Sequence, residues 1–99
     1  MKQLLLILLI ILFPLLAQAQ TAEEYFDMGI AKSNKGDWRG AMQDYNKAIE
    51  LEPIYTDAYI NRGVAKGNLG QKDSGCLDLS KAGEMGYMRA HDLIKKYCQ

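Results

Sequence analysis

The chain has 99 residues, with twelve basic and twelve acidic side chains and a formal net charge of zero at pH 7. This length allows one small domain at most. The even balance of charge provides no basic surface to attract nucleic acid or an anionic membrane, so it argues against both kinds of partner.

The first 19 residues differ in character from the rest. Lys2 is followed by an apolar run over 4–16, and the segment ends in the sequence AQA at 17–19. A short basic start, an apolar stretch and a small-residue A-x-A site are typical of a secretory signal peptide. We therefore expect 1–19 to be a signal peptide, cleaved after Ala19, and the product to be periplasmic or secreted. The alternative is an uncleaved membrane anchor, although spanning the hydrocarbon core takes ~20 apolar residues.

Beyond this leader, the pattern of apolar residues predicts five short helices. In the clearest, Trp38, Ala41 and Tyr45 recur on one face with the 3.6-residue period of an amphipathic helix. Asp37 before that helix is a good N-cap, and Pro53 after it cannot continue it. The expected helices are 22–34, 38–51, 56–69, 72–83 and 88–98, with a capping box formed by Thr21 and Glu24 at the start of the first.

The segment 20–99 also repeats itself. A shift of 34 residues aligns many identical residues, among them Tyr25 with Tyr59, Gly29 with Gly63, Ala31 with Ala65, Lys32 with Lys66, Gly36 with Gly70, Asp44 with Asp78, Lys47 with Lys81, and Ala48 with Ala82. A period of about 34 residues with two helices per unit is that of the tetratricopeptide repeat. Over nearly all of 20–99 the chain resembles this family, which implies an all-α helix-turn-helix solenoid.

The resemblance implies one domain over 20–99, with a first repeat at about 22–55, a second at about 56–87 and a cap helix at about 88–98. In the first repeat, Gly29 stands where paired helices approach closely. The second repeat departs from the pattern: Arg62 replaces the usual leucine and Gly75 the usual alanine. We expect it to be looser, as a terminal repeat often is, with Gly83 and Gly86 ending its second helix in place of a proline.

Residues that could carry chemistry are few. His91 is the single histidine, and Cys76 and Cys98 are the two cysteines. These three could be imagined as metal ligands, but neither a fourth ligand nor CxxC-type spacing supports a zinc site. No glycine-rich phosphate loop occurs. We therefore predict a protein that is not an enzyme and holds no metal or cofactor, with His91 as a partly exposed polar residue of the cap helix.

The two cysteines suggest a disulfide instead, because exported proteins keep such bridges. Antiparallel helices joined by a short turn bring level those residues that are equally far from the turn. The midpoint of Cys76 and Cys98 is Tyr87, beside Gly86 at the expected turn. We predict that the two Cα atoms lie within the roughly 4.4–6.8 Å that a bridge requires. The alternative is a pair of buried free thiols.

In the family that the chain resembles, the first helices of successive repeats line a concave groove that binds a peptide or a partner helix. The resemblance implies that Phe26, Ile30, Ile60 and Val64 form an apolar strip flanked by amides. The alternative is that this strip packs inside the domain or against another copy of the chain. The full set of implied groove residues is Glu23, Phe26, Ile30, Ser33 and Asn34 from the first repeat, and Asp57, Ile60, Asn61, Val64 and Asn68 from the second.

These observations predict a non-catalytic protein–protein interaction module, an adaptor or scaffold in the cell envelope or outside the cell. Its partner would be another protein or a peptide segment, not a nucleic acid or a small-molecule substrate. The alternative is a self-associating structural subunit of an envelope assembly, hence a homo-oligomer, because two repeats are fewer than the three or more usually needed for stability.

Overall fold

The computed structural model describes residues 2–18 and 20–99, and the side chains of 2–10 and 20–99. This part of the chain forms helices and no strands, so the predicted all-α class is confirmed. The predicted cleavage point after Ala19 lies outside the described residues. The helices are α1 (Lys2–Gln18), α2 (Ala22–Asn34), α3 (Trp38–Leu51), α4 (Thr56–Asn68), α5 (Lys72–Glu84) and α6 (Ala90–Tyr97).

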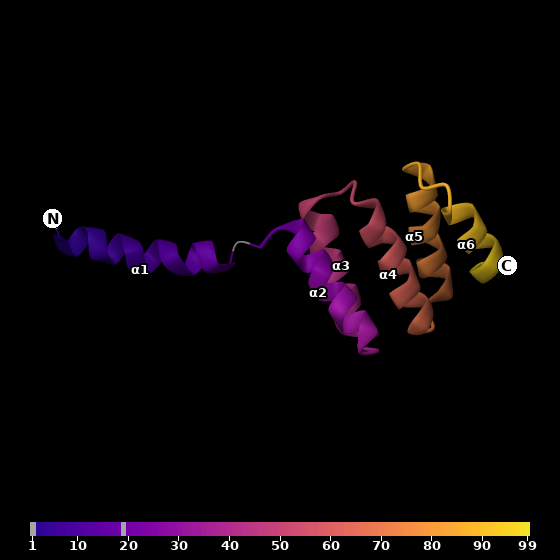
Figure 1. Ribbon diagram of the computed structural model, residues 1–99, viewed down its shortest axis with the longest axis horizontal. Helices are drawn as coiled ribbons and strands as arrows, with labels where there is room; N and C mark the ends of the chain where they lie inside the picture. Colours follow the sequence, from indigo (N-terminus) through magenta and orange to yellow (C-terminus); the bar gives the residue numbers. More distant parts are fainter. Residues whose placement is uncertain (1, 19) are drawn as a thin grey trace.

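Helices α2 to α6 stack in chain order, each packed against the next, while α1 extends away from them (Figure 1). This is the helix-turn-helix solenoid that the repeat implies, with α2 and α3 as the first pair, α4 and α5 as the second, and α6 at the end of the stack. Within the described residues, no helix has both the length and the apolar character that crossing a membrane requires.

The helix ends follow from local chemistry. The hydroxyl of Thr21 accepts a hydrogen bond from the Glu24 amide at 3.1 Å, and the carboxylate of Asp37 accepts one from the Gly40 amide at 3.0 Å. Both are N-caps that satisfy amides left free at the start of a helix. The turns inside the two helix pairs contain Gly36 and Gly70, each with φ near +80°, a conformation that glycine adopts without strain.

The end of the second pair differs in detail from the expectation. Gly83 does not end its helix, because α5 continues to Glu84; a Cβ built at Gly83 would lie 3.4 Å from that of Ala90 in α6. This is an ordinary van der Waals distance, so Gly83 lies in the interface with α6 without being required for its approach. Gly86, with φ +97°, makes the turn as expected. The cap helix begins at Ala90, two residues later than predicted, because Met88 and Arg89 belong to the turn.

The core of the first pair is built around one aromatic ring. Tyr45 is 1% exposed, and a Cβ at Gly29 would lie 2.5 Å from a carbon of its ring. The ring of Tyr45 therefore fits against α2 only because residue 29 is glycine and has no side chain. The Phe26 ring completes the cluster, 5.8 Å from Tyr45 and 5.0 Å from Tyr55 between ring centroids. Both spacings are typical of favourable aromatic contacts.

The second pair is closely packed, so the expectation of a looser repeat is wrong. Gly63 and Gly75 face each other, and a Cβ on either would lie 2.7–2.8 Å from the other's carbonyl oxygen. Gly75 thus replaces the usual alanine where the two backbones meet. Arg62, in place of the usual leucine, donates two hydrogen bonds to the buried carboxylate of Asp78, at 2.9 and 2.7 Å. A charge-assisted pair has replaced an apolar contact.

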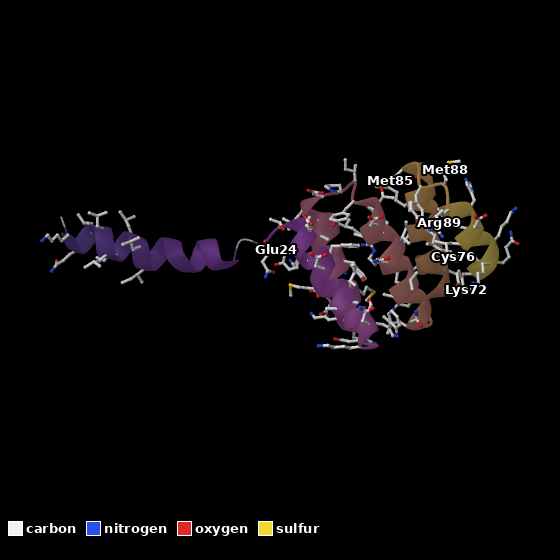
Figure 2. The ribbon with its side chains drawn as sticks, viewed as in Figure 1. Glu24, Lys72, Cys76, Met85, Met88 and Arg89 are labelled. Carbon is white, nitrogen blue, oxygen red and sulfur yellow. A yellow bond between two sulfur atoms is a disulfide. The ribbon has the colours of Figure 1, made fainter. Side chains whose placement is uncertain are left out.

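A third cluster and a disulfide fix α6 to the stack. Ile60, Leu79 and Ala82 form the cluster, and Leu93 and Ile94 of α6 pack against it. Cys76 lies on the side of α5 that faces α6 (Figure 2) and is bonded to Cys98, with 5.9 Å between their Cα atoms. The predicted disulfide is thus present. Neither cysteine is free, so the alternative of two buried free thiols is not what the structure shows.

Candidate protein-binding groove

The first helices of the two pairs, α2 and α4, enclose a shallow depression of about 220 Å³. We call it the groove pocket. Five of the residues expected in the groove converge on it: Ile30, Ser33 and Asn34 from α2, and Asn61 and Val64 from α4. The residues that line it are Ile30, Ser33, Asn34, Trp38, Tyr45, Asn61 and Val64.

Two members of the expected apolar strip have a different role. Ile60 is 8% exposed and packs with Leu79 and Ala82, so it is a core residue and not an open groove wall. Phe26 is half-buried between Tyr45 and Tyr55. These two side chains therefore pack inside the domain, which was the alternative to an open groove. The two positions are covered for different reasons. Phe26 lies where the first helix pair meets the second, whereas Ile60 lies inside the second pair and is covered by α5 and α6.

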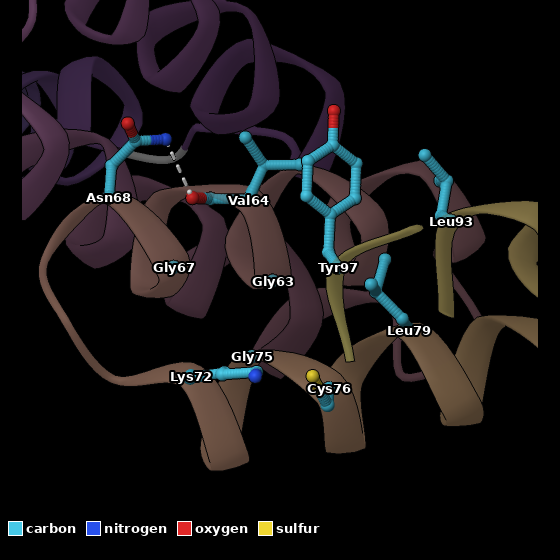
Figure 3. A pocket seen from close by; sticks show the side chains of 10 residues that line it. All are labelled: Gly63, Val64, Gly67, Asn68, Lys72, Gly75, Cys76, Leu79, Leu93 and Tyr97. Carbon is cyan, nitrogen blue, oxygen red and sulfur yellow. Dashed lines mark hydrogen bonds between the residues drawn. The ribbon is translucent and has the colours of Figure 1, made fainter. Parts of the chain in front are cut away.

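Four of the expected polar residues lie at the two ends of the helices. Glu23 and Asp57 are exposed in the first turns of α2 and α4. Asn34 and Asn68 are exposed at the C-terminal ends of the same helices. The amide of Asn68 donates to the Val64 carbonyl at 3.0 Å, which leaves its side-chain oxygen free to accept (Figure 3). Val64, 42% exposed, lies between these ends and offers apolar surface to a partner.

Sequence reasoning did not place Trp38 in the groove. The helical period put it on the same face as Ala41 and Tyr45; its half-buried ring lines the groove pocket from the start of α3. At the base of the pocket, the hydroxyls of Ser33 and Tyr45 are hydrogen-bonded at 3.0 Å. The signal in the sequence was the position of Trp38 directly after a turn, where a ring can reach past the end of the neighbouring helix.

A second and larger depression of about 520 Å³ adjoins the groove (Figure 3). It exists because α6 has 8 residues and α4 has 13, so α6 leaves the C-terminal half of α4 and the start of α5 uncovered. Val64 lines both depressions. The lining residues are Gly63, Val64, Gly67, Asn68, Lys72, Gly75, Cys76, Leu79, Leu93 and Tyr97.

Several basic residues form ion pairs with aspartates between the two helices of each pair. The Lys32 ammonium lies 2.9 Å from the Asp44 carboxylate, and Lys66 makes the equivalent contact to Asp78 at 2.9 Å. Hydrogen bonding to Asp44 raises the pKa of Lys32. In the same way, hydrogen bonding to Asp78 raises the pKa of the Arg62 guanidinium. These cations pair within the fold, so they do not neutralise carboxylates elsewhere on its surface.

The described part of the chain holds no group of three histidine, cysteine, aspartate or glutamate side chains placed to bind a metal ion. His91 is exposed on α6. The groove pocket offers apolar surface from Ile30, Val64 and Trp38, and amide groups from Asn34 and Asn61.

Comparisons with known proteins agree with this architecture. A family model described as TPR repeat matches residues 29–70. An uncharacterised protein of Methanocaldococcus jannaschii is 50% identical over 40 residues, which are 40% of this chain and 46% of that protein. A tetratricopeptide repeat protein 36 homologue of Nematostella vectensis is 33% identical over 66 residues, 67% of this chain and 36% of that protein. The matched segments thus span less than half the length of either relative.

Proposed function

Because the chain belongs to the tetratricopeptide repeat family, whose repeats generally mediate protein–protein interactions, we propose that its groove binds a segment of another protein without catalysis. The observation that carries this proposal is the convergence of Ile30, Asn34, Asn61 and Val64 on one open pocket between α2 and α4. Exposed apolar surface next to unpaired amides suits an extended or helical segment.

We propose further that the protein acts outside the cytoplasm, as an adaptor or scaffold in the periplasm or after secretion. Two features support this. The leader at 1–19 has the composition of a signal peptide. The Cys76–Cys98 disulfide belongs to a class of bond that persists in oxidising compartments. Mass spectrometry of the product made in a Gram-negative host should show a chain that begins at Gln20. A full-length chain held in the inner membrane would make this an anchored protein.

Site-specific photo-crosslinking tests the groove directly. A photo-crosslinking residue in place of Asn34, which is exposed and lines the groove pocket, should give adducts with another protein when the full chain is expressed with its own leader. The matched control is the same residue in place of Leu77, which is 71% exposed on α5 and lines neither depression. Equal adducts from both positions would count against the groove. Adducts between two copies of the chain would indicate the self-associating subunit instead.

A further inference from the structure

One end of the groove is negatively charged, and this charge bears on which kind of peptide can bind there. Four exposed carboxylates, those of Glu23, Asp27, Glu52 and Asp57, gather at the end of the groove where α2 and α4 begin. Within the described residues, the salt bridges of the fold use other carboxylates, and none of these four has a basic partner within 4.0 Å. This end of the groove therefore presents negative charge that the chain itself does not neutralise.

The phenol of Tyr55 lies near all four of these carboxylates. Burial raises the pKa of Tyr55, and the nearby carboxylates raise it further, because a phenolate there would meet several negative charges at once. Tyr55 stacks on Phe26 at 5.0 Å, which places the phenol beside α2 at the junction of the two repeats. The carboxylates that act on it are those of Glu23, Asp27, Asp57 and Glu52.

The pattern continues along both helices in the same register. From the N-terminal end of α2, Glu23, Asp27, Ile30 and Asn34 follow at spacings of four, three and four residues, which keeps them on one face. Shifting by 34 residues gives Asp57, Asn61, Val64 and Asn68 on α4, the same order except that the amide Asn61 stands in place of the acidic Asp27. The face shared by α2 and α4 is thus acidic at one end, aliphatic in the middle and amide at the other end.

We propose, on the basis of the proposed function, that the groove binds an extended peptide segment in which a lysine or arginine lies two residues from a large apolar residue. The cationic side chain lies over the carboxylates of Glu23, Asp27 and Asp57. The apolar side chain enters the groove pocket between Ile30 and Val64, beside Trp38. Complementary charge selects this partner over an acidic one, because like charges brought together disfavour binding.

The spacing of two residues follows from geometry. Along a helix the rise is about 1.5 Å per residue, so the midpoint between Glu23 and Asp27 lies about 7–8 Å from Ile30. In an extended chain, side chains that point the same way are two residues apart, or about 6.6–6.8 Å. A cation and an apolar group at positions i and i+2 therefore match the distance between the acidic end and the pocket.

Trp38 supplies the readout, because it is the only tryptophan of the chain and lines the groove pocket. The probes are synthetic octapeptides without tryptophan that carry Lys-Ser-Leu, Glu-Ser-Leu or Lys-Ser-Ser at their centre. Addition of the Lys-Ser-Leu peptide to the purified chain should change the Trp38 emission saturably. Binding of the Glu-Ser-Leu and Lys-Ser-Ser peptides should be about tenfold weaker or worse, and salt should weaken the binding of the first peptide.

A matched pair of double variants separates the groove charge from net charge. Glu23→Gln with Asp57→Asn removes two groove carboxylates, and the ordinary strength of two exposed charge contacts predicts a loss of roughly two- to thirtyfold in affinity for the Lys-Ser-Leu peptide. Asp73→Asn with Asp92→Asn is the control. All four carboxylates lie in the first turn of a helix, so both variants lose similar helix-dipole stabilisation. The control should leave affinity unchanged.

The outcomes separate this inference from the function on which it rests. Equal binding of the lysine and glutamate peptides, or equal losses in the two double variants, would overturn the charge preference and leave the groove as a binding site. If no peptide binds, the inference also fails. Whether the groove then binds anything is decided by the crosslinking at Asn34.

Discussion

The two helix pairs have nearly the same lengths and the same repeat register, yet they are held together by different means. In the pair α2 and α3, Gly29 leaves room for the large ring of Tyr45. The aligned position to Tyr45 in the pair α4 and α5 is Leu79, a smaller side chain. There the backbones at Gly63 and Gly75 approach until a Cβ on either would clash. The first pair fills the space between its helices with an aromatic ring, whereas in the second pair the two backbones lie so close that little space remains.

The polar contacts differ in the same way. Both pairs contain the lysine–aspartate contact, Lys32 with Asp44 and Lys66 with Asp78. Only the second adds Arg62, which stands where the first pair has Met28. A departure from the repeat pattern is thus not a sign of weakness by itself, because a substitution at one position can be matched by a partner at another.

The largest effect should come from Tyr45→Ala. Removing a fully buried aromatic ring leaves a cavity, which typically lowers the free energy of unfolding by about 3–5 kcal/mol. Urea denaturation followed by circular dichroism measures it. Tyr45→Phe is the control: it keeps the ring and removes only the hydrogen bond to Ser33, for a loss of about 1 kcal/mol. Equal losses in the two variants would mean that the ring does not hold the first pair together.

The disulfide should come next. Replacing Cys76 and Cys98 by serine opens a cross-link between residues 22 apart, and the chain-entropy model gives a loss of about 3 kcal/mol. Hydrogen exchange should show that α6 becomes unprotected while α2 and α3 change little. Thiol titration of the unreduced, denatured wild type should find no reactive thiol, and two per chain would contradict the bridge.

Asp78→Asn should destabilise the protein more than Asp44→Asn, although the two positions are aligned in the repeat. Asp78 neutralises both Arg62 and Lys66, whose side chains are only 18% and 15% exposed, so its loss leaves two largely buried cations; about 2–3 kcal/mol is expected. Lys32 is 38% exposed, so water replaces its partner more easily. Thermal unfolding at neutral pH compares the two, and the reverse order would remove the distinction between the pairs.

The smallest effect is a dependence on alkaline pH. The pKa of Lys32 is raised in the folded chain above its ordinary value of 10.5 by hydrogen bonding to Asp44. Its contribution to stability is therefore fully present below pH 10.5 and is lost as the pH rises through the folded pKa. Asp44→Asn should show a smaller loss of stability than the wild type between pH 9.5 and 11.5. An identical pH profile would show that the pair is not coupled to folding.

Much of this fold could be predicted because the helix caps and turn residues are clear in the sequence. The caps at Thr21 and Asp37 and the turn glycine Gly36 fix the helix boundaries within a few residues. The disulfide followed from the position of one turn, since two antiparallel helices leave little freedom once that turn is known. Local signals of this kind act within a few residues along the chain, where the sequence is sufficient.

The remaining features depend on contacts between residues far apart in the sequence. In the sequence, Arg62 is a charge at a position that is usually apolar. Its partner Asp78 lies 16 residues further along the chain and comes next to it only in the folded structure. Ile60 has the periodicity of a groove residue, but α5 and α6 cover it. The acidic end of the groove likewise joins Glu23 to Asp57, which belong to separate repeats. Helical spacing gives the face of a side chain and leaves open which neighbour will pack against that face.

Arg62 has one further consequence, for the way in which the molecule unfolds. From α4 it reaches α5 through Asp78, and it also donates to the side-chain oxygen of Asn46 in α3 at 3.0 Å. In a linear stack, where each layer touches only its neighbours, a chain can fray from either end one layer at a time. A side chain that bridges three consecutive layers opposes such stepwise loss. We expect α3, α4 and α5 to open as a single cooperative unit, with one shared free energy of hydrogen exchange, while the first turns of α2 open independently of it.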